Sequence, residues 1–359
     1  LPTITISAQP ATRNYADVSA ANRKADPVTV ISVKQPLLGG GLYSRLQMSK
    51  AKKSMADWTV EESRRDIAVR VINAYSQWFA AHSKLEASNE SVIAHEKFTE
   101  LITRRMQSGI STQSDVNQSQ SRLGQARAEQ ASYRSAEFTA LVALNQLVGR
   151  QLSREELKRG ALEEVNLPND IIAQAIAVSP TIHRLEYAAQ VAEHQAGVTK
   201  AQAYPTLSLK AERTINSTTN KNYGTVDSVG LTAEYSSSNG FSSLVQGSAA
   251  DDQYKAALLD VDTARRDLVV QINQDVSEYE FAKVRRQSLA KTVELTQSVS
   301  ESYDRLFRVG KKSWLDLLNA VRERTQTLSS LADVDASLLA TSRRLKIYTT
   351  LQGSDEDTK

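Results

Sequence analysis

The stretch Arg64-Arg65-Asp66-Ile67 recurs as Arg265-Arg266-Asp267-Leu268, at a spacing of 201 residues (265 − 64). Two glycines and two aspartates repeat at the same spacing, Gly109 with Gly310 and Asp115 with Asp316. A unit of this length is far longer than the roughly 20 to 50 residues of a solenoid repeat. The sequence therefore predicts a tandem duplication in which each copy is a small architecture of its own.

Both copies of the motif lie within long segments that contain no helix breaker. The 359 residues include only 14 Gly and 7 Pro, and neither occurs in 42–108 or 248–309. A helix of about 60 residues is about 90 Å long. We expect each long helix to end at Gly109 or Gly310 and a second helix to begin after an N-cap serine, Ser111 or Ser313. Each copy then contains a coiled-coil hairpin.

The last predicted helix carries a heptad pattern. Apolar residues recur every seven positions, at Trp314, Val321, Leu328 and again at Leu331, Leu338, Leu345. This spacing is typical of a coiled coil with one narrow apolar seam. The remaining broad polar face suits either the wall of a water-filled tube or the solvent side of a rod.

Each copy opens with period-2 alternation, which indicates strands with two different faces. Apolar residues alternate in the segments 4–6, 28–33, 207–209 and 229–235, and polar loops at 12–26 and 216–222 separate the paired strands. Four strands cannot close a barrel, and lipid does not tolerate open sheet edges. Either several copies of the chain close one barrel, or the strands form an ordinary four-stranded sheet packed on a helix.

Composition excludes several classes of function. Lys and Arg number 44 and Asp and Glu 41, so the net charge of +3 does not favour nucleic-acid binding. Cysteine is absent, which excludes thiol catalysis and thiolate metal sites. The four histidines lack the spacing of helical metal ligands, and Gly39-Gly40-Gly41 lacks the Gly-Lys-Ser/Thr ending of a P-loop. We therefore expect no enzyme, cofactor or metal site.

These segments divide the chain as follows. The first repeat covers 1–150, with a β-hairpin at 3–38 and a coiled-coil hairpin at 42–148, and a linker with a short helix follows at 149–180. The second repeat covers 181–352, with a leading helix at 181–203, a β-hairpin at 206–236 and a coiled-coil hairpin at 242–351, before a polar tail at 353–359. The first repeat has no counterpart of the leading helix, so we expect a segment of that length to be missing at the front.

Local patterns in the same order resemble the outer-membrane efflux and secretion duct family typified by TolC. They are Gln35-Pro36-Leu37-Leu38-Gly39-Gly40-Gly41, Arg105-Met106-Gln107-Ser108-Gly109, Ser179-Pro180-Thr181-Ile182, Tyr204-Pro205-Thr206-Leu207-Ser208-Leu209, and Phe307-Arg308-Val309-Gly310 with Trp314-Leu315-Asp316-Leu317-Leu318-Asn319-Ala320. Each is weak alone, but their order and the long repeat together are specific.

The resemblance implies a mainly α fold with a small β part. Three copies would close one twelve-stranded β-barrel in the outer membrane, continued by an α-helical barrel of antiparallel coiled coils through the periplasm. The homotrimer would be a passive export duct for type I protein secretion or small-molecule efflux, joined by a periplasmic adaptor to an inner-membrane ABC, RND or similar transporter. The alternative is a structural coiled-coil rod or scaffold with a local β-sheet.

The resemblance also implies site residues near the two hairpin turns. Asp316 and Asn319 match the ring that narrows the periplasmic entrance. Asp115 and Lys312 fall where a polar link closes the gate, and Phe307 stands where some relatives place an aromatic hydroxyl. Adaptor docking would use the two turns, at Arg105, Gln107, Ser108, Gly109, Leu306, Arg308, Val309 and Gly310.

Overall fold

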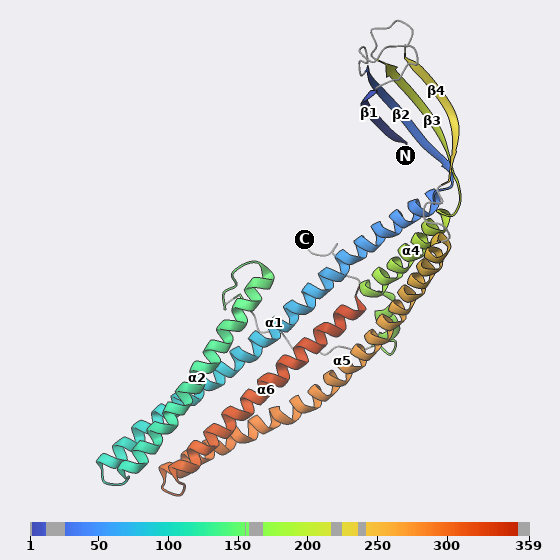
Figure 1. Ribbon diagram of the computed structural model, residues 1–359. Coiled ribbons are helices and arrows are strands. Elements are labelled where there is room, and N and C mark those ends of the chain that lie inside the picture. The colour runs from blue at the N-terminus through green and yellow to red at the C-terminus, as the bar shows by residue number, and fades with distance from the viewer. Residues whose placement is uncertain are drawn as a thin grey trace. The chain divides into compact units, whose positions relative to one another are not determined.

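The computed structural model describes residues 2–11, 26–154, 156–157, 168–216, 225–235 and 242–350. Within them the chain is mainly helical, with a four-stranded antiparallel sheet (Figure 1). This confirms the predicted fold class of long helices with a small β part. Most of the two predicted polar loops, and all of the tail at 353–359, lie outside the described residues.

The chain forms two compact units, and each unit combines segments of both sequence repeats. The strand unit comprises Leu1–Thr59 and Thr181–Ala264, and the hairpin unit comprises Val60–Pro180 and Arg265–Lys359. Equivalent parts of the two copies therefore pack with each other, so that the compact units do not follow the sequence repeats.

The sheet of the strand unit has the order β1-β2-β3-β4, with every neighbouring pair antiparallel. Its strands are β1 (Thr3–Ala11), β2 (Asp26–Leu38), β3 (Thr206–Asn216) and β4 (Val226–Glu234). Residues that pair directly across strands lie on the same face. One such row across all four strands is apolar, Ile4, Val33, Ala211 and Val229, and the next row, on the other face, is Thr3, Lys34, Lys210 and Gly230.

The exit from β2 is a tight passage made possible by glycine. Gly39 has a φ of 84°, and a Cβ atom built there would lie 2.4 Å from the carbonyl oxygen of Pro205. No residue with a side chain fits such an approach without moving the backbone. Gly39 therefore fixes where the first hairpin ends and the first long helix begins.

Six helices account for the rest of the described chain. They are α1 (Leu42–Gln107), α2 (Gln113–Val148), α3 (Ile171–Ala177), α4 (Pro180–Ala201), α5 (Ser242–Arg308) and α6 (Trp314–Thr349). The two long helices have 66 and 67 residues. No helix in the described ranges combines the length and the apolar character that crossing a membrane requires.

The core of the hairpin unit is built around α6. One cluster joins α6 to α3 and α5, a second joins it to α1 near Trp78, and a third contains one buried residue from each of α1, α2, α5 and α6. Leu338 and Leu345 of the heptad pattern are buried, but so are Thr325, Ser329 and Thr341. The prediction of one narrow seam was therefore wrong for α6, because neighbours cover it on several sides.

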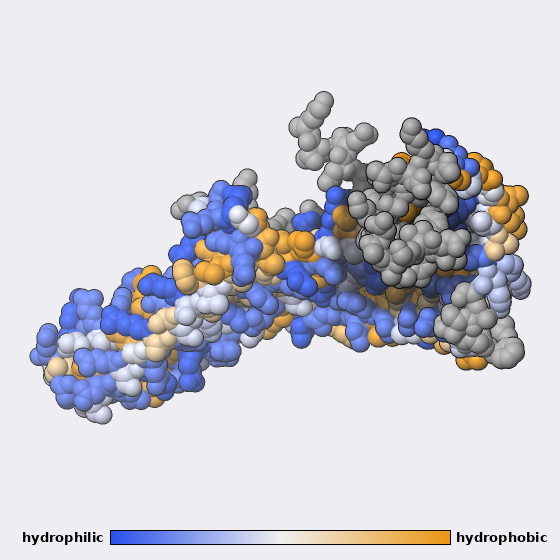
Figure 2. Space-filling view, turned by 45° about the horizontal axis from the view of Figure 1, so that its top comes forward, coloured by the Kyte–Doolittle hydropathy of each residue, from blue (hydrophilic) through white to orange (hydrophobic). Residues whose placement is uncertain are grey.

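The second helix of the first repeat differs in this respect. In α2 only a few positions are buried, among them Val116, Ala126 and Leu144, and they follow one stripe. Much of the rest of this helix is accessible, including the apolar residues Phe138 and Val142. The face of the molecule in Figure 2 is mostly hydrophilic over its helices. The returning helices α2 and α6 occupy equivalent places in the two hairpins but differ in burial.

Candidate gate and docking turns

The first hairpin turn follows the end of α1 and is closed by main-chain hydrogen bonds. The N–H of Gly109 donates to the carbonyl of Met106 at 2.9 Å, and the N–H of Ile110 donates to that of Arg105 at 2.8 Å. Gly109 has a φ of 72°, the left-handed conformation that ends many helices. The predicted docking residues Gln107 and Ser108 lie exposed on this turn.

The second turn repeats the same geometry. The N–H of Gly310 donates to the carbonyl of Phe307 at 3.0 Å, and the N–H of Lys311 donates to that of Leu306 at 2.9 Å. Gly310 has a φ of 77°. Arg308 and Val309 are exposed there, and Arg308 pairs with Asp304 at 2.8 Å. The two predicted turns therefore share their backbone hydrogen bonds and their glycine.

The N-caps of the returning helices differ from the prediction in one case. Ser313 caps α6, and its hydroxyl accepts from the N–H of Asp316 at 3.1 Å, as expected. Thr112, and not Ser111, caps α2. Thr112 precedes Asp115 by three residues, so the two side chains cap each other's backbone N–H, and Ser111 has no acid at that spacing.

Both aspartates of the repeat therefore act at helix starts. Hydrogen bonds from the Thr112 backbone and hydroxyl hold the pKa of the Asp115 carboxyl below its usual 3.8, with a smaller contribution from the Trp314 side chain. A hydrogen bond from the Ser313 hydroxyl, together with the charge of Lys312, lowers the pKa of Asp316 in the same way. Each carboxylate is ionised at neutral pH and remains accessible to solvent.

Lys312 pairs within its own turn. Its Nζ lies 3.6 Å from the Asp316 carboxylate and 4.4 Å from the ring centroid of Tyr303. Within the chain it does not pair with Asp115, whose carboxylate is bound at the capping box. The predicted gate link between Lys312 and Asp115 stays a prediction.

Phe307 lies in the core of the turn region. It is buried with Ile102, Val116 and Leu317, so that α1, α2, α5 and α6 all meet there. The guanidinium carbon of Arg105 lies 4.9 Å from the centroid of its ring, a cation–π contact. Phe307 and Arg105 thereby tie α5 to α1 just before the turns.

Ile110, at the first turn, was not among the predicted docking residues, whereas Val309, at the second turn, was. Ile110 and Val309 are each 66% exposed, one at each tip, and each is adjacent to the turn glycine. An apolar residue beside a turn glycine is the signal that could have marked Ile110. Asn319 is exposed on α6 one turn beyond Asp316. The described residues contain no group of three or more His, Asp or Glu side chains able to hold a metal ion.

The chain matches a known family over both repeats. Residues 1–150 and 171–349 match the outer membrane efflux protein family. The chain belongs to this family. Its members are transport channels of the outer membrane and not enzymes, so the export-duct interpretation is confirmed over the rod or scaffold.

Two relatives in the family have different transport tasks, protein secretion and efflux. The chain is 23% identical to the alkaline protease secretion protein AprF of Pseudomonas aeruginosa, over 94% of this chain and 74% of AprF. It is 25% identical to the probable efflux pump outer membrane protein TtgC of Pseudomonas putida, over 42% of this chain and 33% of TtgC.

Solved channels share the fold. The outer-membrane channel OprN superposes with a TM-score of 0.83 at 17% identity, over 97% of this chain and 81% of OprN. VceC of Vibrio cholerae superposes with a TM-score of 0.80 at 16% identity, over 97% of this chain and 86% of VceC. At this identity the likeness establishes the fold alone.

Proposed function

We propose that three copies of this chain form a passive export duct without catalytic activity of its own, which takes cargo from an inner-membrane transporter through a periplasmic adaptor. The family match over both repeats is the observation that carries this proposal. The residue roles at the turns are part of the proposal.

The sheet supports assembly of several copies. β1 and β4 are both open edges, and an unpaired edge is a template for pairing with another chain. Ile4 and Val229, at the two edges of the apolar row, are 66% and 74% exposed. Pairing β1 of one copy with β4 of the next would close the sheet and turn its apolar face toward lipid.

The entrance ring rests on the accessibility of Asp316. Its side chain is 45% exposed and ionised, so three copies would bring three carboxylates together and attract cations. Asn319 adds a polar but uncharged position one turn further on. The ring would then carry a single charge per copy.

The proposed gate and the docking turns lie at the same end of the hairpin unit. Asp115, Lys312 and the buried Phe307 would hold the hairpins closed, with links weak enough to be broken by an adaptor. The exposed apolar residue Ile110 would meet that adaptor together with the predicted turn residues, of which Val309 is also exposed and apolar. An adaptor that binds both tips would then act on both hairpins at once.

We propose secretion of a protein as the transport task. The similarity to AprF spans nearly the whole chain, whereas that to TtgC spans less than half. The test is complementation of strains that lack their own channel, with protease in the medium and drug resistance as the two readouts. Restored protease secretion without restored resistance is expected, and the reverse result would overturn the assignment.

Channel conductance tests the duct itself. In planar bilayers the wild type should prefer cations, and Asp316→Asn should remove most of that preference. Glu323→Gln is the matched control, because Glu323 is an exposed acid on the same helix away from the turn. Absence of channels would refute the duct, while an unchanged preference in Asp316→Asn would refute only the ring.

A further inference from the structure

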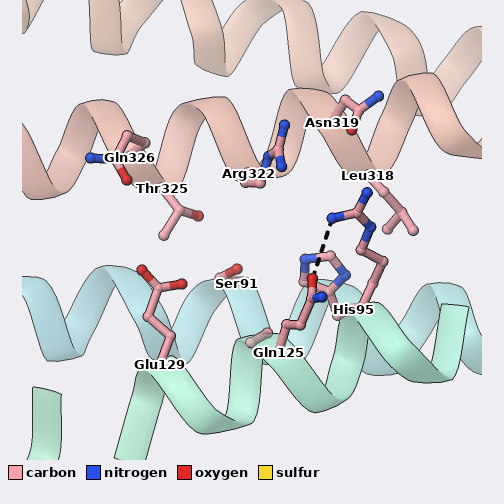
Figure 3. Close-up of a pocket in the computed structure, with 11 residues that line it drawn as sticks. Ser91, His95, Gln125, Glu129, Leu318, Asn319, Arg322, Thr325 and Gln326 are labelled. Atoms are coloured by element: carbon pink, nitrogen blue, oxygen red, sulfur yellow. Dashed lines mark hydrogen bonds between the residues drawn. The ribbon is translucent and has the colours of Figure 1, made fainter. Parts of the chain in front are cut away.

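A polar pocket in the hairpin unit is separate from the turns. It lies between α6 and the α1–α2 pair and has a volume of about 100 Å³ (Figure 3). Ser91 and His95 of α1 and Thr325 of α6 are its buried polar residues, and Arg122 of α2 and Arg322 of α6 also line it. Polar groups from three helices therefore converge on one small space.

The imidazole of His95 leaves a hydrogen-bonding position open in this pocket. The residue is only 6% exposed, and its Nδ1 is buried without a hydrogen-bond partner. Burial, together with the charge of Arg122, lowers the pKa of His95, so the ring is neutral at pH 7. A buried ring nitrogen without a partner is unfavourable, and a bound group that satisfies it would stabilise the site.

Two guanidinium groups at the pocket have no carboxylate to neutralise them. Arg122 donates to the neutral amide oxygen of Gln125 at 3.2 Å, and Arg322 has no hydrogen bond or ion pair among the described residues. The lining also contains Glu129, which accepts from the Tyr133 hydroxyl at 3.2 Å. Figure 3 shows Glu129 at the end of the pocket beside Thr325, away from His95.

Glu129 is too far along α2 to neutralise Arg122. Seven residues separate the two, which is a rise of about 10 Å along a helix. The end of the pocket near His95 thus combines two unpaired positive charges with a ring nitrogen that lacks a partner. Such a combination is complementary to an anion with several oxygen atoms.

We propose that this pocket binds one small tetrahedral oxyanion per chain, of the sulfate or phosphate class, held by Arg122 and Arg322 with the His95 ring donating an N–H. The pocket volume admits an ion of this size. Because Arg122 belongs to the first hairpin and Arg322 to the second, the bound ion would bridge them. The site uses none of the docking turns and stands independently of the duct proposal.

Sulfate titration of the full-length protein in detergent tests the site, because the charge of sulfate is constant near neutral pH. Calorimetry at constant ionic strength should show saturable binding of one ion per chain. Arg122→Gln and Arg322→Gln should each weaken it about tenfold or more, the effect of losing one charge-assisted hydrogen bond. Glu129→Gln should change sulfate affinity much less than either arginine substitution, because Glu129 lies at the other end of the pocket from His95 (Figure 3).

Arg134→Gln is the matched control. Arg134 is an exposed arginine on α2 outside the pocket, so its loss should leave sulfate affinity unchanged. Sulfate should also raise the melting temperature of the wild type but not of the double variant Arg122→Gln with Arg322→Gln. Equal weakening in Arg134→Gln, or no saturable binding by the wild type, would overturn the proposal, and far-UV circular dichroism checks that each variant is folded.

Discussion

Replacing Arg154 with Gln should destabilise the hairpin unit, because it removes an ion-pair partner from a fully buried carboxylate. Glu137 of α2 has 0% of its side chain exposed. Arg154 Nη2 lies 2.6 Å from Oε2 of Glu137, as an ion pair whose geometry is not that of a hydrogen bond. His82 Nδ1 lies 2.8 Å from Oε1, the other carboxylate oxygen. Breaking a buried pair costs about 3–5 kcal/mol.

The cost here should lie at or below the lower end of that range, since the Arg154 side chain is 52% exposed and partly solvated. We expect about 2–3 kcal/mol, which lowers the melting temperature of a unit this size by roughly 4–12 °C. Trp78 reports locally, because its ring stacks on His82 with centroids 5.0 Å apart. Thermal unfolding followed by tryptophan fluorescence is therefore the assay.

Arg127→Gln provides the control for this prediction. Arg127 pairs with Glu96 at 2.7 Å, but the two side chains are 59% and 46% exposed. Such exposed pairs contribute about 0.2–1 kcal/mol. The two variants change the same charge at nearly the same distance and differ in burial. Equal shifts in melting temperature would refute the reasoning that burial of Glu137 sets the cost.

Three further outcomes follow from the caps and glycines. The folded-state pKa values of Asp115 and Asp316 lie below the usual 3.8, so their contribution to stability is present above that pH and is lost as the pH falls through the lowered values. Unfolding midpoints should therefore fall more steeply below pH 4 in the wild type than in the double Asp→Asn variant. Gly124→Ala should stabilise α2 by up to about 1 kcal/mol, because that glycine is helical with open space around it. Gly39→Ala should lower the melting temperature clearly, since its Cβ would lie 2.4 Å from the Pro205 oxygen, and an unchanged value would contradict the close approach.

Much of the architecture could be predicted because its signals are local. The 201-residue repeat, the segments without Gly or Pro and the period-2 strands each specify an element directly. The cap of α2 was misjudged by one residue because two adjacent hydroxyls compete, and only the spacing from Thr112 to Asp115 decides between them. Patterns within single segments thus predicted the helices and strands, and they placed the N-cap of α2 within one residue.

Features that depend on several helices at once could not be predicted. Phe307 matched a family position, but its burial results from four helices meeting, which no single segment encodes. The pocket near His95 requires α1, α2 and α6 together. The sequence alone left a surface and a packing role open for this histidine, and only the structure reveals its burial and the ring nitrogen without a partner.

The unequal burial of α2 and α6 has a consequence for how the chain tolerates change. Two copies of one ancestral unit began with the same constraints, yet α6 now touches neighbours on several sides while α2 keeps one buried stripe. Among randomly substituted variants that still fold, substitutions should therefore be more frequent in α2 than in α6. Duplication has left this chain with one returning helix, α2, under weaker packing constraints than its counterpart α6.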